Sequence, residues 1–139
     1  MEIFETWRDL PPEARGATVV LGNFDGVHLG HAHLLRTAHA AAPGAPLAVL
    51  TFEPHPRQVF RPDDPPFRLT DAASRAAALR ALGVRRLFQL RFDHDFSLMP
   101  AETFVAEVLH RGLGAGHLAC GPDFAFGRRR GGDAGFLAA

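Results

Sequence analysis

Short apolar runs alternate with amphipathic segments along most of the chain. A continuous apolar run covers residues 17–22, and short, mainly apolar runs cover residues 46–52, 86–90 and 117–121, each of a length typical of a buried strand. Apolar positions at helical spacing lie between them, over residues 31–42, 72–82 and 100–111. We also expect an edge strand near Ile3. Strands that alternate with helices predict a parallel sheet covered on both faces, which is a Rossmann-like, doubly wound α/β fold.

Residues at the segment ends support these boundaries. Pro43-Gly44 and Gly83 follow the first and second helices, and Thr70-Asp71 precedes the second one as a cap. In that second helix we expect Leu79 and Leu82 to face inward. After the second strand, Glu53-Pro54-His55-Pro56 stops the ladder, because two prolines so close together cannot continue it. Residues 93–99 are predicted to be a connection, and residues 122–133 a Gly/Arg-rich loop.

Composition limits the function classes. The 139 residues are 47% hydrophobic and 22% charged, which predicts one domain over residues 1–139 with one core. A net charge of zero gives no global field that favours nucleic acid or an anionic membrane. No apolar run approaches the roughly 20 residues that span a bilayer, and the N-terminus does not resemble a signal peptide. With Cys120 as the single cysteine, we expect a cytoplasmic protein.

The segment most informative about chemistry is Gly22-Asn23-Phe24-Asp25-Gly26-Val27-His28-Leu29-Gly30-His31. It is a Gly-rich turn between a strand and a helix, where α/β proteins bind phosphates. His28 and His31 are three residues apart, so both imidazoles lie on one side of the helix entry, and Gly30 leaves the space between them open. Two other interpretations are a structural turn with incidental histidines and a zinc pair. Zinc is disfavoured because no second ligand pair accompanies these histidines, so we predict no protein metal site.

The remaining histidines and the cysteine carry no such pattern. We expect surface or ordinary structural roles for His33, His39, His94, His110 and His117. Cys120 lies in an apolar strand and is predicted to be a small core residue rather than a nucleophile.

Further motifs follow the first one in order. They are Thr51-Phe52-Glu53-Pro54-His55-Pro56, Arg68-Leu69-Thr70, Leu82-Gly83-Val84, Phe92-Asp93 and Gly121-Pro122-Asp123-Phe124-Ala125-Phe126-Gly127. Together they resemble the FMN adenylyltransferase (FAD synthetase) domain of bacterial bifunctional riboflavin kinase/FAD synthetases, in the H-x-G-H nucleotidyltransferase superfamily. The resemblance runs from about residue 17 to residue 133.

This resemblance implies transfer of AMP from ATP to FMN with Mg²⁺, giving FAD and pyrophosphate. His28 and His31 would contact the ATP phosphates and stabilise charge in the transition state. The nucleotide site would be lined by Gly22, Asn23, Phe24, Asp25 and Gly30. The flavin side would be formed by Pro54, His55, Phe60, Asp123 and Phe126. For these five, structural roles such as loop anchoring, core packing or turn capping stay open. Arg128, Arg129 and Arg130 are either a solvated loop or a phosphate-attracting lid, and we assign no single arginine.

The chain also departs from the family pattern. Pro122 stands where the family has an acidic residue, and Arg75 and Arg128 stand where it often has lysine. The family's domain continues beyond the length of this chain with a segment that completes the ATP site, and a riboflavin kinase domain normally follows. We therefore expect an incomplete adenylyltransferase domain without kinase activity, of unknown oligomeric state.

Two alternatives to FMN adenylylation stay open. One is an adenylyltransferase for another phosphate monoester, such as phosphopantetheine or nicotinamide mononucleotide. The T-F-x-P-H-P and G-x-D-F-x-F-G segments argue against it. The other is a non-catalytic flavin- or nucleotide-binding fragment.

Overall fold

A computed structural model describes residues 1–22, 24, 29–53 and 71–120. Five parallel strands form one sheet in the order β1-β4-β3-β2-β5. The strands are β1 (Glu2–Phe4), β2 (Thr18–Leu21), β3 (Leu47–Glu53), β4 (Arg86–Arg91) and β5 (His117–Cys120). Strand β2 thus lies between β3, the next strand along the chain, and β5, the last one described. The predicted parallel α/β fold is confirmed.

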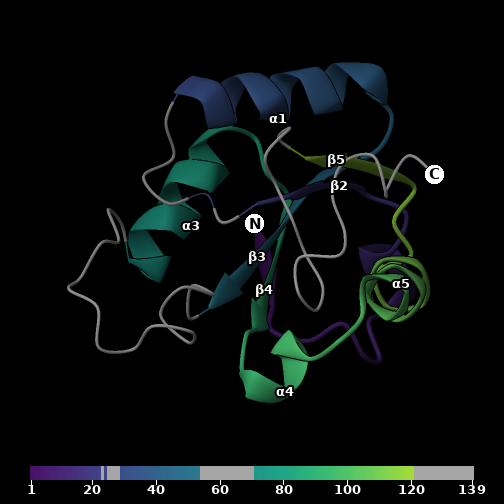
Figure 1. The fold of residues 1–139 in the computed structure, drawn as a ribbon. Helices are drawn as coiled ribbons and strands as arrows, with labels where there is room; N and C mark the ends of the chain where they lie inside the picture. The colour runs from purple at the N-terminus through teal and green to yellow at the C-terminus, as the bar shows by residue number, and fades with distance from the viewer. Residues whose placement is uncertain (23, 25–28, 54–70, 121–139) are drawn as a thin grey trace.

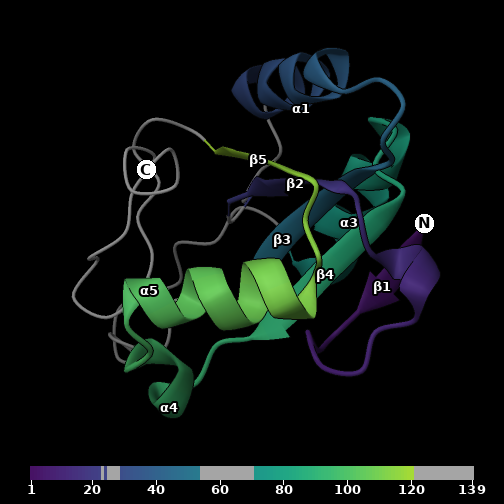
Figure 2. The ribbon, with the colours of Figure 1, turned by 90° about the vertical axis from the view of Figure 1, so that its right-hand side faces the viewer.

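Helices cover both faces of this sheet (Figure 1). They are α1 (Leu29–Ala41), α3 (Ala72–Ala81), α4 (His94–Ser97) and α5 (Ala101–Thr103), with η1 (Pro12–Ala14) as a short 3₁₀ turn. Helix α5 continues directly into η2 (Phe104–Gly112), which is wound as a π-helix. Figure 2, turned by 90°, shows this continuous helix in front of the sheet and α3 behind it.

The first core cluster fills the space between the sheet and helices α1 and α3. Alternate residues of the strands point to this face, because successive side chains of a strand point to opposite sides. Val20, Val49 and Leu87 from three neighbouring strands pack against Leu35 of α1 and Leu79 of α3, all of them buried. The prediction that Leu79 faces inward is therefore confirmed.

The second core cluster lies on the opposite face. Val19, Leu50 and Phe88 of the strands pack against Phe104 and Val108 of η2. With both faces covered, the central strands are mainly apolar, as the sequence pattern predicted. Within the described residues, no helix has the length and apolar character needed to cross a membrane.

Three predictions about local structure were wrong. Leu82 does not face inward but is 38% exposed, because α3 ends at Ala81 and Leu82 is its C-cap. Strand β5 is not buried, since it is the last strand on its side of the described sheet, where Leu118 is 38% exposed and Cys120 is half-buried. The connection at residues 93–99 contains the short helix α4, whose cap Asp93 accepts a hydrogen bond from the Phe96 amide.

Candidate active site

The predicted phosphate turn begins where β2 ends. Gly22 follows Leu21 and donates its amide hydrogen to the carbonyl oxygen of Leu50 in β3, at 3.2 Å. The chain crosses from β2 to β3 on one side of β2, whereas β5 pairs with its other side. In open parallel sheets, ligands bind beyond the carboxyl ends of the strands at such a change of direction. The predicted turn therefore begins at the edge of the sheet where open parallel folds bind ligands.

Phe24 has an unusual backbone conformation within this turn. Its φ angle is 55°, in the left-handed region that bulky residues rarely adopt. The side chain is nonetheless only 2% exposed and packs in the core cluster with Val20 and Leu35. Burial of a large ring holds the backbone in a conformation that costs on the order of 1–3 kcal/mol, and such residues are concentrated at functional sites. Phe24 was predicted to line the nucleotide site, and the structure places its ring in the core cluster between β2 and α1.

His31 lies in the first turn of α1 and contacts the ring of Phe24. Its imidazole centre is 4.8 Å from the centre of the Phe24 ring, with the planes inclined at 41°. The histidine is half-buried, whereas Gly30 beside it is exposed. The N-terminus of a helix carries partial positive charge and favours phosphate groups. The structure thus brings together Gly22, Phe24, Gly30 and His31 around the start of α1.

The other predicted site residues lie outside the described part of the chain. They are His28, Asn23, Asp25, Pro54, His55, Phe60, Asp123 and Phe126, together with Arg128, Arg129 and Arg130. Their roles remain predictions.

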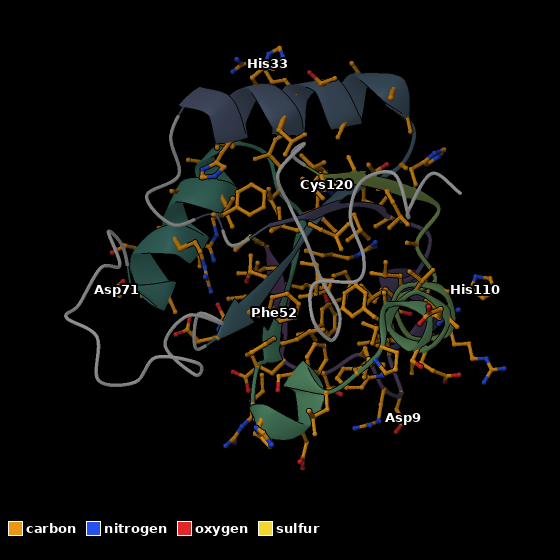
Figure 3. All side chains as sticks on the ribbon, viewed as in Figure 1. Asp9, His33, Phe52, Asp71, His110 and Cys120 are labelled. Carbon is orange, nitrogen blue, oxygen red and sulfur yellow. The ribbon has the colours of Figure 1, made fainter. Side chains whose placement is uncertain are left out.

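The histidines that were assigned no site role are all exposed: His33, His39, His94, His110 and His117. His33 is on the same helix as His31 but points outward from α1, and His110 points outward from η2 (Figure 3). Among the residues that the structure describes, no group of three or more histidine, cysteine, aspartate or glutamate side chains is placed to hold a metal ion.

One buried charge near the carboxyl edge was not predicted from the sequence. The side chain of Arg75 in α3 is 1% exposed, and its Nη2 atom lies 3.1 Å from Oε2 of Glu53, the last residue of β3. The same nitrogen donates to Oε1 of Gln89 in β4, at 3.2 Å. The sequence did carry a signal for it, because polar residues replace apolar ones on the α3 side of both strands, at Thr51 and Glu53 and at Gln89.

Known proteins are similar to this chain in sequence. The bifunctional riboflavin kinase/FMN adenylyltransferase of Pseudomonas fluorescens is 41% identical to this chain over 139 residues. The match covers 99% of this chain and 44% of that protein. The protein of the same name from Escherichia coli K12 is 38% identical over 120 residues, covering 85% of this chain and 38% of that protein. The chain thus spans less than half the length of these curated relatives.

A solved structure matches the fold. A crystal structure described as a macrolide-efflux protein from Streptococcus pneumoniae has a TM-score of 0.81 and 29% sequence identity, and the match covers 98% of this chain and 45% of that one. The model of the FAD synthetase family matches residues 10–139, which include every strand but the first and the complete phosphate turn. The chain belongs to the FAD synthetase family.

Proposed function

We propose that this chain transfers AMP from ATP to FMN, forming FAD and pyrophosphate. The observation that carries the proposal is the family match over residues 10–139. The position of the histidine-containing turn beyond β2, the strand between β3 and β5, supports it, because the carboxyl edge of a parallel sheet is where such folds bind nucleotides.

In the proposed reaction, a phosphate oxygen of FMN attacks the α-phosphorus of ATP. The new P–O bond forms as the bond to the bridging oxygen of the β-phosphate breaks, and pyrophosphate leaves with that electron pair. No covalent enzyme intermediate is needed. Catalysis of this kind is mostly positioning and stabilisation of charge on the phosphoryl oxygens.

His31 and His28 are the residues to which we assign charge stabilisation. His31 packs against Phe24 at 4.8 Å between ring centres, which restricts the orientations that its imidazole can adopt. The start of α1 adds its partial positive charge at the same place. We propose that Gly22, Phe24 and Gly30, with Asn23 and Asp25, line the nucleotide side of this site.

FMN would bind beside ATP, beyond the ends of β3 and β5. This assignment places Pro54, His55, Phe60, Asp123 and Phe126 on the flavin side. Strands β3 and β5 both pair with β2 in parallel, so all three end at the same edge of the sheet. Mg²⁺ would enter with the phosphates of ATP, because it is commonly bound through substrate phosphates and few protein ligands.

The relatives are named as bifunctional, so we further propose that this domain works in the cytoplasm in a protein that also holds a riboflavin kinase domain. We assign no kinase activity to residues 1–139.

Two measurements test the function together. Titration of FMN with the purified protein follows the quenching of flavin fluorescence, and chromatography follows FAD formation from FMN, ATP and Mg²⁺. We expect saturable quenching and ATP-dependent FAD formation. Quenching without FAD formation would indicate the non-catalytic flavin binder. If FMN is not bound but phosphopantetheine or nicotinamide mononucleotide is adenylylated, the substrate assignment is wrong.

A further inference from the structure

On the α3 side of the sheet, β3 and β4 become polar toward their carboxyl ends. Leu47 and Val49 of β3 are buried in the apolar cluster, but the next residues on that face are Thr51 and Glu53. In β4, Gln89 is paired in register with Thr51 and continues the same change. The apolar core on this face therefore ends at Val49 and Leu87, two residue pairs before the strands do.

Arg75 of α3 contacts two of these polar residues, Glu53 and Gln89. It lies in the first turn of α3, which is fixed by its cap: Asp71 accepts a hydrogen bond from the Ser74 amide at 2.7 Å, and the Arg75 amide donates to the Asp71 carbonyl. A guanidinium Nη atom has two hydrogens, and Nη2 of Arg75 has two acceptors, Glu53 at 3.1 Å and Gln89 at 3.2 Å. The side chain thus joins α3 to the last residue of β3.

The ion pair between Arg75 and Glu53 is expected to add little net stability. Arg75 is 1% exposed while Glu53 is 30% exposed, so the cation has lost almost all of its hydration. Removal of a charge from water costs about as much as a buried partner returns, and replacing a buried pair with apolar residues is often neutral or stabilising. A buried pair that gives little net stability but fixes a particular chain position points to a positioning role.

On the other face of the sheet, the residue before Glu53 is also fixed by contacts. Phe52, whose side chain points away from Glu53, packs against Phe92 and Phe96, with ring centres 5.5 Å away in both cases, and against Phe104 of η2 at 6.4 Å. Figure 3 shows Phe52 inside the molecule. The last two residues of β3 are therefore fixed on both faces of the sheet, directly before Pro54 in the sequence.

We propose that Arg75 is a positioning residue for the adenylyltransferase site. By holding Glu53, it sets the direction in which the chain leaves β3 toward Pro54-His55-Pro56. We infer that this fixed direction strengthens the binding of FMN. This inference rests on the proposed function, in which FMN binds beyond β3 and ATP beyond β2. Arg75 itself contacts neither substrate in this role.

The experiment compares Arg75→Met, Arg75→Lys and Glu53→Gln with the unmodified protein, in the longest form that its gene encodes. Arg80→Met is the matched control, because Arg80 is exposed on the same helix. For each protein we would measure the FMN dissociation constant, the KM for FMN and for ATP, and kcat. Hydrogen exchange would be followed in a peptide that spans the end of β3 and in one that covers α1.

We expect Arg75→Met to raise the FMN dissociation constant and KM at least tenfold and to leave the KM for ATP within twofold. Arg75→Lys should restore part of the loss, because an ammonium group keeps the charge but not the planar geometry of the guanidinium. Exchange should become faster at the end of β3 and stay unchanged in α1. Arg80→Met should match the unmodified protein in every measurement.

The proposal is overturned if folded Arg75→Met or folded Glu53→Gln binds FMN within twofold of the unmodified protein. An equal loss for FMN and ATP, with faster exchange in both peptides, would also overturn it, because it would indicate a general structural role. Should Arg75→Met fail to fold, Arg75→Lys and Glu53→Gln decide by the same criteria. If the unmodified protein neither binds FMN nor forms FAD, the proposed function itself is wrong, which separates that failure from the others.

Discussion

The ring of Phe24 occupies the space where a side chain on Gly22 would lie. A Cβ atom built on Gly22 would lie 2.9 Å from Cε2 of that ring, closer than real Cβ contacts come. The ring cannot give way easily, because it is buried against Val20 and Leu35. The absence of a side chain at residue 22 is thus what lets Phe24 fill the core beneath the phosphate turn.

Gly22→Ala should therefore destabilise the protein. Insertion of a methyl group into a packed site costs about 1–3 kcal/mol, and urea-induced unfolding measures it. Gly44→Ala is the control, because a Cβ there meets nothing within 4 Å. Equal unfolding midpoints for the two variants would show that Phe24 can move aside without cost.

The two histidines at the start of α1 should behave differently. His31 contacts Phe24 at the proposed site, whereas His33 is exposed and points outward. We expect His31→Ala to lower kcat for FAD formation by about 10²–10³, the effect typical of a lost charge-stabilising donor. FMN binding should be largely retained, and His33→Ala should stay within twofold. A His31→Ala enzyme within tenfold of the unmodified kcat would contradict the assigned role.

Arg15 should stabilise the end of η2. Its Nη1 atom donates to the carbonyl oxygens of Arg111 and Gly112, at 2.6 and 2.9 Å. A cation at a helix C-terminus interacts favourably with the carbonyl ends. Arg15→Ala should lower the free energy of unfolding by about 1 kcal/mol, while Arg36→Ala, on the exposed side of α1, should not change it. Thermal unfolding of the two variants and the unmodified protein measures the difference in the free energy of unfolding.

Thr51→Val is expected to stabilise the protein. The hydroxyl of Thr51 is fully buried and has no hydrogen-bond partner in the part of the chain that the structure describes. Valine has nearly the same shape and no polar group to satisfy, so the gain should be up to about 1 kcal/mol in chemical denaturation. Thr37→Val should give no gain, because the Thr37 hydroxyl already donates to the His33 carbonyl. A less stable Thr51→Val protein would mean that this hydroxyl has a partner in solution.

Most of the fold could be predicted from local pattern. The runs that became β2, β3 and β4 are mainly apolar because both faces of the sheet are covered, and that pattern indicates a parallel sheet. The position of β5 could not be read in this way. Its sequence is apolar like the others, but it pairs with β2 at the end of the described sheet, so Leu118 faces solvent.

The candidate site was predictable where chemistry depends on residues close in sequence. Gly22, Gly30 and His31 come together because one turn joins one strand to one helix. Arg75 was not predictable in this way, since an arginine in an alanine-rich helix usually faces solvent, and its burial depends on Glu53 and Gln89 from two distant strands. The helix cap at Asp93 was a missed local signal rather than a long-range effect.

The pairing of β2 with β5 has a consequence for synthesis of the chain. Thr18 and His117 are partners in register, so the strand that bears the phosphate turn receives its second neighbour only after nearly all the described residues have been made. Until then, β2 exposes one row of unpaired backbone groups, the kind of edge that recruits other strands. During synthesis, the strand that supports the proposed ligand site therefore presents an open edge at which other chains can associate.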